Sequence, residues 1–340
     1  MMEFARFNER YFSKLKNVSI NLSDLEKPGY WVVVGGFEND WLLLEFEKSQ
    51  VEVPKINGHW HGVNKADWTS SLSEEQYLKA VEVLRENIAR GEVYQANLCR
   101  VLSAAWPKDS DISGLANLLL KGNPAPFSAV ISVFESSNFR LTKDVQIASA
   151  SPELYLRREG NEIFSSPIKG TGRVASDLTE KDSAENVMIV DLVRNDISRV
   201  CQVGSVKVPN LLSVEEHPGL VHLVSTVTGE LKPDVTWEEI FAATFPPGSV
   251  TGAPKISALK LIQELEASPR GPYCGAIGWI DSFSKTAQLA VGIRTFWKDK
   301  DQLKFGTGAG ITWGSNAQKE WDETELKTEK LLSLAASQNG

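Results

Sequence analysis

The sequence predicts an α+β protein with large, mostly antiparallel β-sheets. Short apolar runs rich in β-branched and aromatic residues follow one another along the chain, as the strands of an antiparallel sheet do. Between them lie segments in which apolar residues recur at helical spacing. No stretch rich in proline, glycine or serine divides the chain into clear parts.

The length and composition indicate a folded protein. The chain has 340 residues, of which 42% are apolar and 24% charged, close to the averages of globular proteins. At roughly 150 residues per domain, this length allows two ordinary domains or one large one. The 36 Lys and Arg against 44 Asp and Glu give a net charge of −8. This balance argues against a nucleic-acid partner, because binding to phosphates favours a basic surface.

Neither a transmembrane helix nor a secretory signal is expected. The most apolar run, 31–37, has the length of a strand and contains two glycines, whereas a membrane span needs about 20 apolar residues. Glu3 and Glu9 lie where a signal peptide would carry positive charge and a continuous apolar stretch. The three cysteines show no CxxC spacing. We therefore expect a cytoplasmic protein with reduced thiols and no membrane partner.

The two periodicities of apolar residues predict the elements in order. WVVVGGF (31–37) and WLLLEF (41–46) predict a hairpin, and a helix is expected from Ser73, which can form a capping box with Gln76, to Gly91. Further helices are expected at 179–194, 236–244, 255–267 and 317–334. Further strands are expected at 93–101, 127–134, 153–157, 222–229, 275–280, 287–297 and 303–312.

Two amides interrupt the apolar face of the strand at 93–101. Gln95 and Asn97 alternate with Val93 and Cys99 on one face. A solvated strand face explains this pattern about as well as a polar site does. The residues alone leave both interpretations open.

Two glycine-containing segments are candidates for a ligand site. GTGAG (306–310) lacks the third glycine of a dinucleotide-binding loop, and no Walker loop occurs. It predicts a strand end whose N–H groups can approach a carboxylate, or a tight bend of the sheet. Lys169 lies in PIKGTGR (167–173). A lysine there is ordinarily solvated, but a buried one can lose its proton near neutral pH and act as a nucleophile.

Two of the predicted helices carry carboxylates. Glu320, Glu323 and Lys327 share one face of the last helix, a pattern that usually forms exposed ion pairs. Glu185 lies among apolar neighbours in the helix at 179–194. If Glu185 met Glu323 across a cavity, a cation would have to lie between them, and oxygen ligands suit Mg²⁺.

Taken together, eight segments resemble the chorismate-utilising enzyme family. This family includes anthranilate synthase component I, isochorismate and salicylate synthases, and aminodeoxychorismate synthase component I. The segments occur in family order from about residue 71 onward. They are GEVYQANL (91–98), ASPELYL (150–156), PIKGT (167–171), AENVMIVDLVRND (184–196), HLVSTVTGEL (222–231), PPGSVTGAPK (246–255), AVGIRT (290–295) and GTGAGITWGSNAQKEWDETELK (306–327).

The resemblance implies an architecture. It is a single large domain of two mostly antiparallel β-sheets packed together with helices outside, the anthranilate synthase component I-like fold. Residues 1–70 would form a reduced N-terminal segment that completes the sheets. Residues 71–340 would form the chorismate-binding catalytic region.

The resemblance also implies a site for chorismate and Mg²⁺. Glu185 and Glu323 match the metal ligands, with Glu320 close by. Glu153 matches the general acid that protonates the departing C4 hydroxyl, and His222 matches the histidine beside the ring. The residues that match substrate-binding positions, directly or in support, are Ser249, Thr171, Tyr273, Arg294, Gly308, Gly310 and Lys327.

Two catalytic positions distinguish among the reactions of the family. Gln95 replaces the lysine that activates water in isochorismate-type members, so the resemblance disfavours water addition. Lys169 resembles the aminodeoxychorismate synthases, because anthranilate synthases usually have alanine there. The resemblance therefore implies that a lysine amine adds at C2 while the C4 hydroxyl leaves, and that ammonia then attacks C4. The product would be 4-amino-4-deoxychorismate, a precursor of p-aminobenzoate and folate.

Nothing in the chain resembles a glutaminase triad. We therefore expect a separate glutamine amidotransferase subunit to supply the ammonia, in a heterodimer. An anthranilate synthase component I, or an isochorismate or salicylate synthase, with an unusual lysine is the alternative within the family. A non-catalytic ligand-binding homologue is the alternative of another class. The retained set of candidate catalytic and metal residues argues against it.

Overall fold

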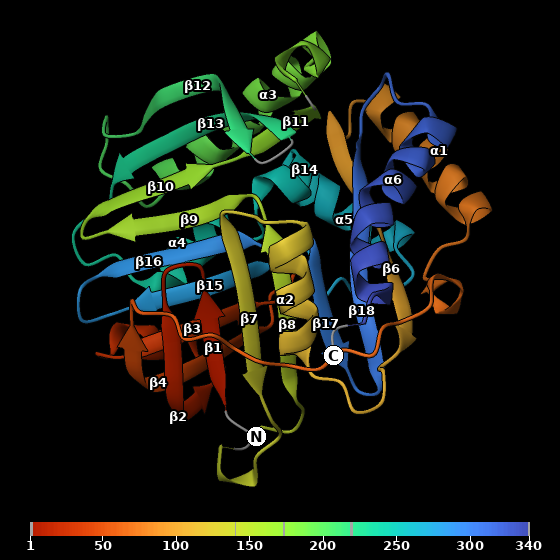
Figure 1. The fold of residues 1–340 in the computed structure, drawn as a ribbon. Helices are drawn as coiled ribbons and strands as arrows, with labels where there is room; N and C mark the ends of the chain where they lie inside the picture. Colours follow the sequence, from red (N-terminus) through yellow and green to blue (C-terminus); the bar gives the residue numbers. More distant parts are fainter. Residues whose placement is uncertain (1–2, 140, 173, 218–219, 339–340) are drawn as a thin grey trace.

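The computed structural model describes residues 3–139, 141–172, 174–217 and 220–338 (Figure 1). Hydrogen bonds connect 18 strands of these ranges into one system, and the strand pairings described below are all antiparallel. Helices cover the outside (Figure 1). The α+β architecture with large antiparallel sheets is therefore confirmed, although the sheets are joined to each other rather than separate.

Ten strands make up what we call the first strand group. They are β2 (Tyr11–Ser19), β3 (Tyr30–Gly35), β4 (Trp41–Gln50), β9 (Leu154–Glu159), β10 (Glu162–Ser166), β11 (Ile168–Gly172), β12 (Lys207–His217), β13 (Leu220–Glu230), β15 (Ala276–Asp281) and β16 (Thr286–Val291). Their order in space is β12–β13–β10–β9–β16–β15–β3–β4–β2. Strand β11 also pairs with β13.

The other strands form the second strand group. They are β1 (Phe4–Phe7), β5 (Thr69–Ser70), β6 (Gln95–Ala105), β7 (Phe127–Val133), β8 (Val145–Ser151), β14 (Gly252–Ala253), β17 (Thr295–Asp299) and β18 (Gln302–Ile311). They follow the order β1–β7–β8–β17–β18–β6, with β5 and β14 against β6. Strand β1 also pairs with β2 and so joins the two groups. The division of the chain at residue 70 stays a prediction.

Six helices of at least eight residues lie in the described part of the chain. They are α1 (Glu74–Ala89), α2 (Ile112–Gly122), α3 (Glu180–Ser198), α4 (Trp237–Thr244), α5 (Lys255–Leu265) and α6 (Ala317–Ala336). Short 3₁₀ helices are η1 (Leu22–Glu26), η2 (Lys65–Asp67), η3 (Ser137–Phe139), η4 (Ala175–Asp177) and η5 (Gly248–Val250). The capping box expected at Ser73 and Gln76 is present at the start of α1. The five expected helices all occur, and α2 was not predicted.

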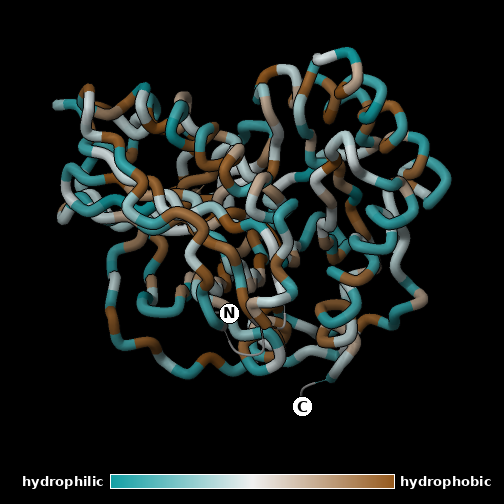
Figure 2. The backbone as a smooth tube through the Cα atoms, turned by 90° about the horizontal axis from the view of Figure 1, so that it is seen from above, coloured by the Kyte–Doolittle hydropathy of each residue, from teal (hydrophilic) through white to brown (hydrophobic). Residues whose placement is uncertain are grey.

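The apolar side chains of both groups form the core. In Figure 2, hydrophobic segments run through the interior, whereas hydrophilic segments mark the outer helices and turns. The main cluster packs side chains of both strand groups together with α3 and α4. A second cluster packs α2 and α6 against strands of the second group. Among the residues that the structure describes, none of the helices has the length and apolar character needed to cross a membrane.

Two of the chain's crossings between the strand groups lie next to each other. The strand expected at 287–297 is wrong as one element, because it is broken between β16 and β17, where Arg294 has a φ of +52°. Strand β16 pairs within the first group and β17 within the second. The chain makes the same passage at Glu153, between β8 and β9. The backbone N–H of Val291 donates to the Glu153 carbonyl at 3.0 Å, so the two passages lie side by side.

The N-terminal strands provide a first test of this architecture. Phe12 of β2 is fully buried and packs against the rings of Phe7 and Phe46. We expect Phe12→Ala to lower the free energy of unfolding by about 3–5 kcal/mol, because it leaves a cavity where β2 meets β1. Urea denaturation measures this loss. Ile20→Ala, at a side chain that is 79% exposed, is the control, and an equal loss in both variants would contradict the packing described.

Candidate active site

Residues from four elements meet at the junction of the strand groups. The amine of Lys169, on β11, donates a hydrogen bond to the Ser249 carbonyl of η5 at 3.2 Å. A Cβ placed at Gly310 of β18 would lie 3.9 Å from Lys169 Nζ and would collide with the Gln95 amide at the start of β6. A larger residue at Gly310 would therefore displace the Gln95 amide, which glycine leaves in place. Gln95 itself is 1% exposed, so the open question about the face of this strand is settled in favour of a buried polar one.

The pKa of the Lys169 amine lies below that of an exposed lysine. Burial lowers the pKa of its amine, although Glu185 and Glu153 oppose this shift by attraction. The positive charge of Lys327 lowers it further, and Glu323 acts in the opposite direction. A larger fraction of the neutral amine is therefore present near neutral pH than in an exposed lysine. A neutral amine has the free electron pair that a nucleophile needs.

Glu153 is a buried acid that can complement the Lys169 amine by donating a proton. Its side chain is buried, and burial raises the pKa of its carboxyl from 4.5 to about 7. Hydrogen bonds from the Ser249 side chain and the Ile168 backbone, together with the charge of Lys169, work against this rise and limit it. A substantial share of Glu153 is consequently protonated at neutral pH and able to donate a proton.

His222 lies on β13, the strand that pairs with the strand of Lys169. It is 2% exposed on β13, and its register partners are Thr171 on β11 and Glu215 on β12. Lys169 pairs with Leu223, the next residue of β13. The backbone of Thr171 therefore lies in the site, while its side chain is outside the described part of the chain.

Arg294 lies at the crossing between β16 and β17, and Tyr273 lies against the glycine-rich strand β18. Burial lowers the pKa of Arg294, and among the described residues no carboxylate forms an ion pair with it. The Cys274 N–H donates to the Gly292 carbonyl at 3.0 Å, which holds the Tyr273 segment beside Arg294. Tyr273 is buried with its ring under Gly306 of β18. A desolvated guanidinium without a counter-ion is costly and would be stabilised by an anionic ligand.

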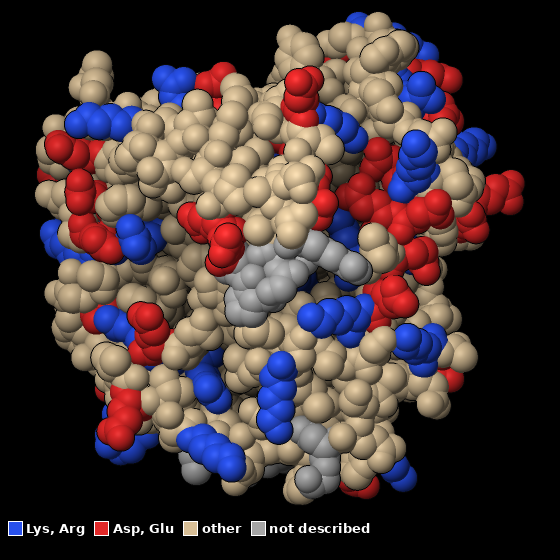
Figure 3. Space-filling model, turned by 45° about the horizontal axis from the view of Figure 1, so that its top comes forward, with Lys and Arg blue, Asp and Glu red and all other residues tan. Residues whose placement is uncertain are grey.

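Helices α3 and α6 bring their carboxylates together. The Lys181 ammonium lies 3.6 Å from Glu185 and 3.9 Å from Glu320, so one cation already bridges the two helices. Glu323 instead pairs with Lys327 at 2.7 Å. Burial, and then the nearby charge of Glu323, raise the pKa of Glu320, although a Ser315 hydrogen bond opposes them. Acidic side chains gather on this face, at the upper right of Figure 3.

Lys327 connects this acidic face to the glycine-rich strand. Its Nζ donates to the Gly308 carbonyl at 3.0 Å while it pairs with Glu323. The described residues contain no group of three or more His, Cys, Asp and Glu side chains close enough to form a complete metal site. Two carboxylates that already share an ammonium are nevertheless suitable oxygen donors for a hard cation such as Mg²⁺.

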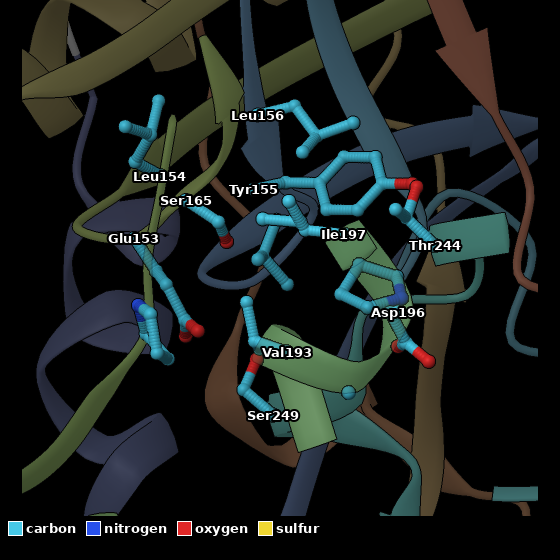
Figure 4. Close-up of a pocket in the computed structure, with 14 residues that line it drawn as sticks. Glu153, Leu154, Tyr155, Leu156, Ser165, Val193, Asp196, Ile197, Thr244 and Ser249 are labelled. Carbon is cyan, nitrogen blue, oxygen red and sulfur yellow. The ribbon is translucent and has the colours of Figure 1, made fainter. Parts of the chain in front are cut away.

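A small cavity of about 20 Å³ lies beside Glu153. In Figure 4, Glu153 and Asp196 lie on opposite sides of it, with Ser249 also in its wall. Tyr155 and Thr244 contribute two hydroxyl groups that are hydrogen-bonded to each other at 2.7 Å. This volume is enough for one water-sized molecule with polar partners. Sequence reasoning missed Asp196, although it ends the matching segment AENVMIVDLVRND.

The chain is similar in sequence to known proteins. A family model described as chorismate binding enzyme matches residues 39–333. Aminodeoxychorismate synthase component 1 of Escherichia coli K12 is 37% identical over 279 residues, which are 78% of this chain and 59% of that protein. Anthranilate synthase component 1 of Archaeoglobus fulgidus is 38% identical over 307 residues, 87% of this chain and 69% of that protein. The chain therefore belongs to the chorismate-binding enzyme family.

Solved structures show the same fold. A putative 2,3-dihydroxybenzoate-specific isochorismate synthase from Bacillus anthracis superposes with a TM-score of 0.79 at 22% identity, covering 98% of this chain and 96% of that one. Anthranilate synthase component I from Streptococcus pneumoniae gives a TM-score of 0.77 at 23% identity, with coverages of 97% and 90%. The fold is thus the anthranilate synthase component I-like α+β fold.

The raised pKa of Glu153 predicts how stability depends on pH. The folded chain holds this proton up to about pH 7 and the unfolded chain only to about 4.5, so the stabilisation is complete below pH 4.5 and is lost as pH rises through 7. Glu153→Gln removes this dependence. The free energy of unfolding of the wild type should therefore fall by about 3 kcal/mol relative to Glu153→Gln between pH 4.5 and 8. Urea denaturation across this range measures the difference.

The matched control is Glu238→Gln, at an exposed position on α4. It should leave the pH dependence of the wild type unchanged. If Glu153→Gln also follows the wild-type curve, the carboxyl of Glu153 is not held in its protonated form by burial.

Proposed function

We propose that this chain is an aminodeoxychorismate synthase component I, which converts chorismate and ammonia into 4-amino-4-deoxychorismate. The observation that carries the proposal is the Lys169 amine, desolvated, hydrogen-bonded to Ser249 and close to the protonatable Glu153. Overall identity does not choose between products, because relatives named for two different reactions match at 37% and 38%. The lysine is the feature that favours amination at C4.

In the first step, the neutral amine of Lys169 adds to C2 of chorismate. The ring double bonds shift as the C2–N bond forms, and the C4–O bond breaks. Glu153 gives its proton to the departing hydroxyl, which leaves as water. The substrate is then held on Lys169 as a secondary ammonium, and Glu153 is a carboxylate.

In the second step, ammonia attacks C4. The double bonds shift back as the C4–N bond forms, and the C2–N bond breaks to return the neutral amine to Lys169. The new nitrogen gives a proton to the Glu153 carboxylate, so both residues recover their starting states. Two displacements thereby place the amino group at C4, with water as the other product.

The remaining candidates would hold and orient the substrate. Arg294, a partly buried cation without a carboxylate partner among the described residues, would bind a carboxylate of chorismate. Tyr273, Lys327, Thr171 and the N–H groups of Gly308 and Gly310 would support it, with His222 beside the ring. The buried Oε1 of Gln95 has no hydrogen-bond partner among the described residues, which leaves it able to accept from the substrate. An amide cannot act as the base that activates water.

Glu185, Glu320 and Glu323 are the residues that would hold Mg²⁺. The bridging position of the Lys181 ammonium supports the fit, because Glu185 and Glu320 already face a common positive charge. When bound, Mg²⁺ would neutralise negative charge of the substrate and let an acidic face accept a dianion. Lys181 would have to give up its bridging position to the metal.

A glutamine amidotransferase subunit would supply the ammonia. The curated relatives are named as component 1 of their synthases, which supports a two-component enzyme.

The second candidate function is an anthranilate synthase component I, favoured by the 38% identity to the Archaeoglobus protein. In that reaction ammonia itself would add at C2. The isochorismate and salicylate reactions are disfavoured by Gln95, and a non-catalytic role by the assembled acid, amine and buried arginine.

The product of the reaction tests the proposal. With chorismate, Mg²⁺ and an ammonium salt, the chain should form 4-amino-4-deoxychorismate, identified by chromatography and mass spectrometry. Lys169→Ala should lower this 4-amination at least about a hundredfold, because it removes the nucleophile. Lys298→Ala, which removes a lysine that pairs with Asp144 near the end of β17, should retain it. Exclusive formation of anthranilate or isochorismate by the wild type would overturn the proposal.

The metal ligands are tested by replacing the two carboxylates that share Lys181. Glu185→Gln and Glu320→Gln should each raise the Mg²⁺ concentration that gives half the maximal rate by at least about tenfold. They should also abolish any rise in Tm that Mg²⁺ gives the wild type. Glu329→Gln, at an exposed position on the same helix α6, is the control. An unchanged Mg²⁺ requirement in both site variants would contradict the assignment.

A further inference from the structure

The η5 segment is held in place by a buried lysine on one side. Lys255, the first residue of α5, donates from its Nζ to the carbonyls of Thr244 at 3.0 Å and Pro246 at 2.9 Å. The same ammonium forms an ion pair with Asp196 of α3 at 2.6 Å, and the side chains of both partners are largely buried. One cation therefore fixes the backbone that enters η5.

A buried arginine holds the other side of η5. Arg270 is 1% exposed and donates to the carbonyl of Val250 at 2.9 Å and to the carbonyl of Asn97 at 2.7 Å. Its charge is paired with Glu266 at 2.6 Å. The planar guanidinium can reach both carbonyls at once because its donors form a rigid fork. It thereby ties the end of η5 to β6, two residues after Gln95 on that strand.

Ser249 lies between these two attachments. Its carbonyl accepts the hydrogen bond from Lys169, and its side chain bonds to Glu153. Thr244 and Pro246 are anchored before it along the chain, and Val250 directly after it. The position of the Ser249 peptide therefore depends on Lys255 and Arg270, although neither forms a described hydrogen bond or ion pair with Lys169 or Glu153.

We propose that Lys255 and Arg270 are positioning residues that hold the Ser249 carbonyl where it orients the amine of Lys169. A neutral amine that donates one N–H to a fixed carbonyl has its electron pair directed elsewhere, so the acceptor decides which way the nucleophile points. A displacement of about 1 Å at such a group can cost a hundredfold in rate. The inference rests on the proposed function, because it takes Lys169 as the nucleophile.

Two ion pairs can hold the backbone around η5 for a physical reason. The carbonyls of Thr244, Pro246 and Val250 lie in an irregular segment without strand partners and need donors from elsewhere. Side-chain cations supply several strong donors at once. Asp196 and Glu266 then compensate the buried charges, which unpaired would be costly.

Two variants test the inference. Lys255→Met should lower kcat for 4-amination at least about tenfold while KM for chorismate changes less than about twofold, because the nucleophile is misdirected but the binding groups stay. Arg270→Lys keeps the positive charge but cannot reach both carbonyls, and should act in the same direction. In both, amide hydrogen exchange followed by mass spectrometry should show faster deuterium uptake in 244–254.

The matched control is Lys298→Met. It removes another partly buried ion pair, with Asp144 at 2.7 Å, on a strand remote from η5, so it should leave kcat and the exchange of 244–254 unchanged. If Lys255→Met does not fold, Asp196→Asn makes the same test with little change in shape. Unchanged exchange in 244–254, or a parallel loss of kcat and binding of chorismate, overturns the inference. The exchange is read without substrate, so it stands even if the wild type forms another product.

Discussion

The passage of the chain between the two strand groups is the constraint on which the site depends. Around the junction of the two groups, several backbone carbonyls have no strand partner and need donors from elsewhere. Basic side chains donate to them: Lys169 to Ser249, Lys327 to Gly308, Arg270 to Val250, and Lys255 to Thr244 and Pro246. Two of these donors, Lys169 and Lys327, thus both complete the fold and belong to the proposed site.

The same burial acts in opposite directions on the two proposed catalytic groups. It raises the pKa of Glu153 to about 7 and lowers the pKa of Lys169, because a low-dielectric environment disfavours the charged form of each. Both shifts act toward a protonated acid beside a neutral amine, which is the combination that the proposed first step requires. Ser249 contacts both groups, and the two ion pairs around η5 keep it in place.

The sequence predicted the elements better than their meeting points. Apolar periodicity located five helices within a few residues of their ends, because each has one buried face. It missed α2, in which the buried residues occupy more than one face. It also predicted a continuous strand at 287–297, because the break at Arg294 follows from pairing with different neighbours, and local composition does not encode that pairing.

The candidate site, too, could be predicted from the sequence only in part. Local patterns singled out several site residues before the resemblance supplied the others, namely Gln95, Lys169, Glu185, Glu320, Glu323, Lys327 and the glycines of 306–310. The structure places Glu185 with Glu320 across Lys181. Lys255 and Arg270 were not singled out, since their role depends on three-dimensional contacts with carbonyls.

The most direct test of the proposed reaction is mass spectrometry of the Lys169 peptide after the chain is mixed with chorismate and Mg²⁺ without ammonia. The proposed reaction predicts an adduct of chorismate less one water on Lys169; 4-amination on adding ammonium, with no such adduct, would contradict it.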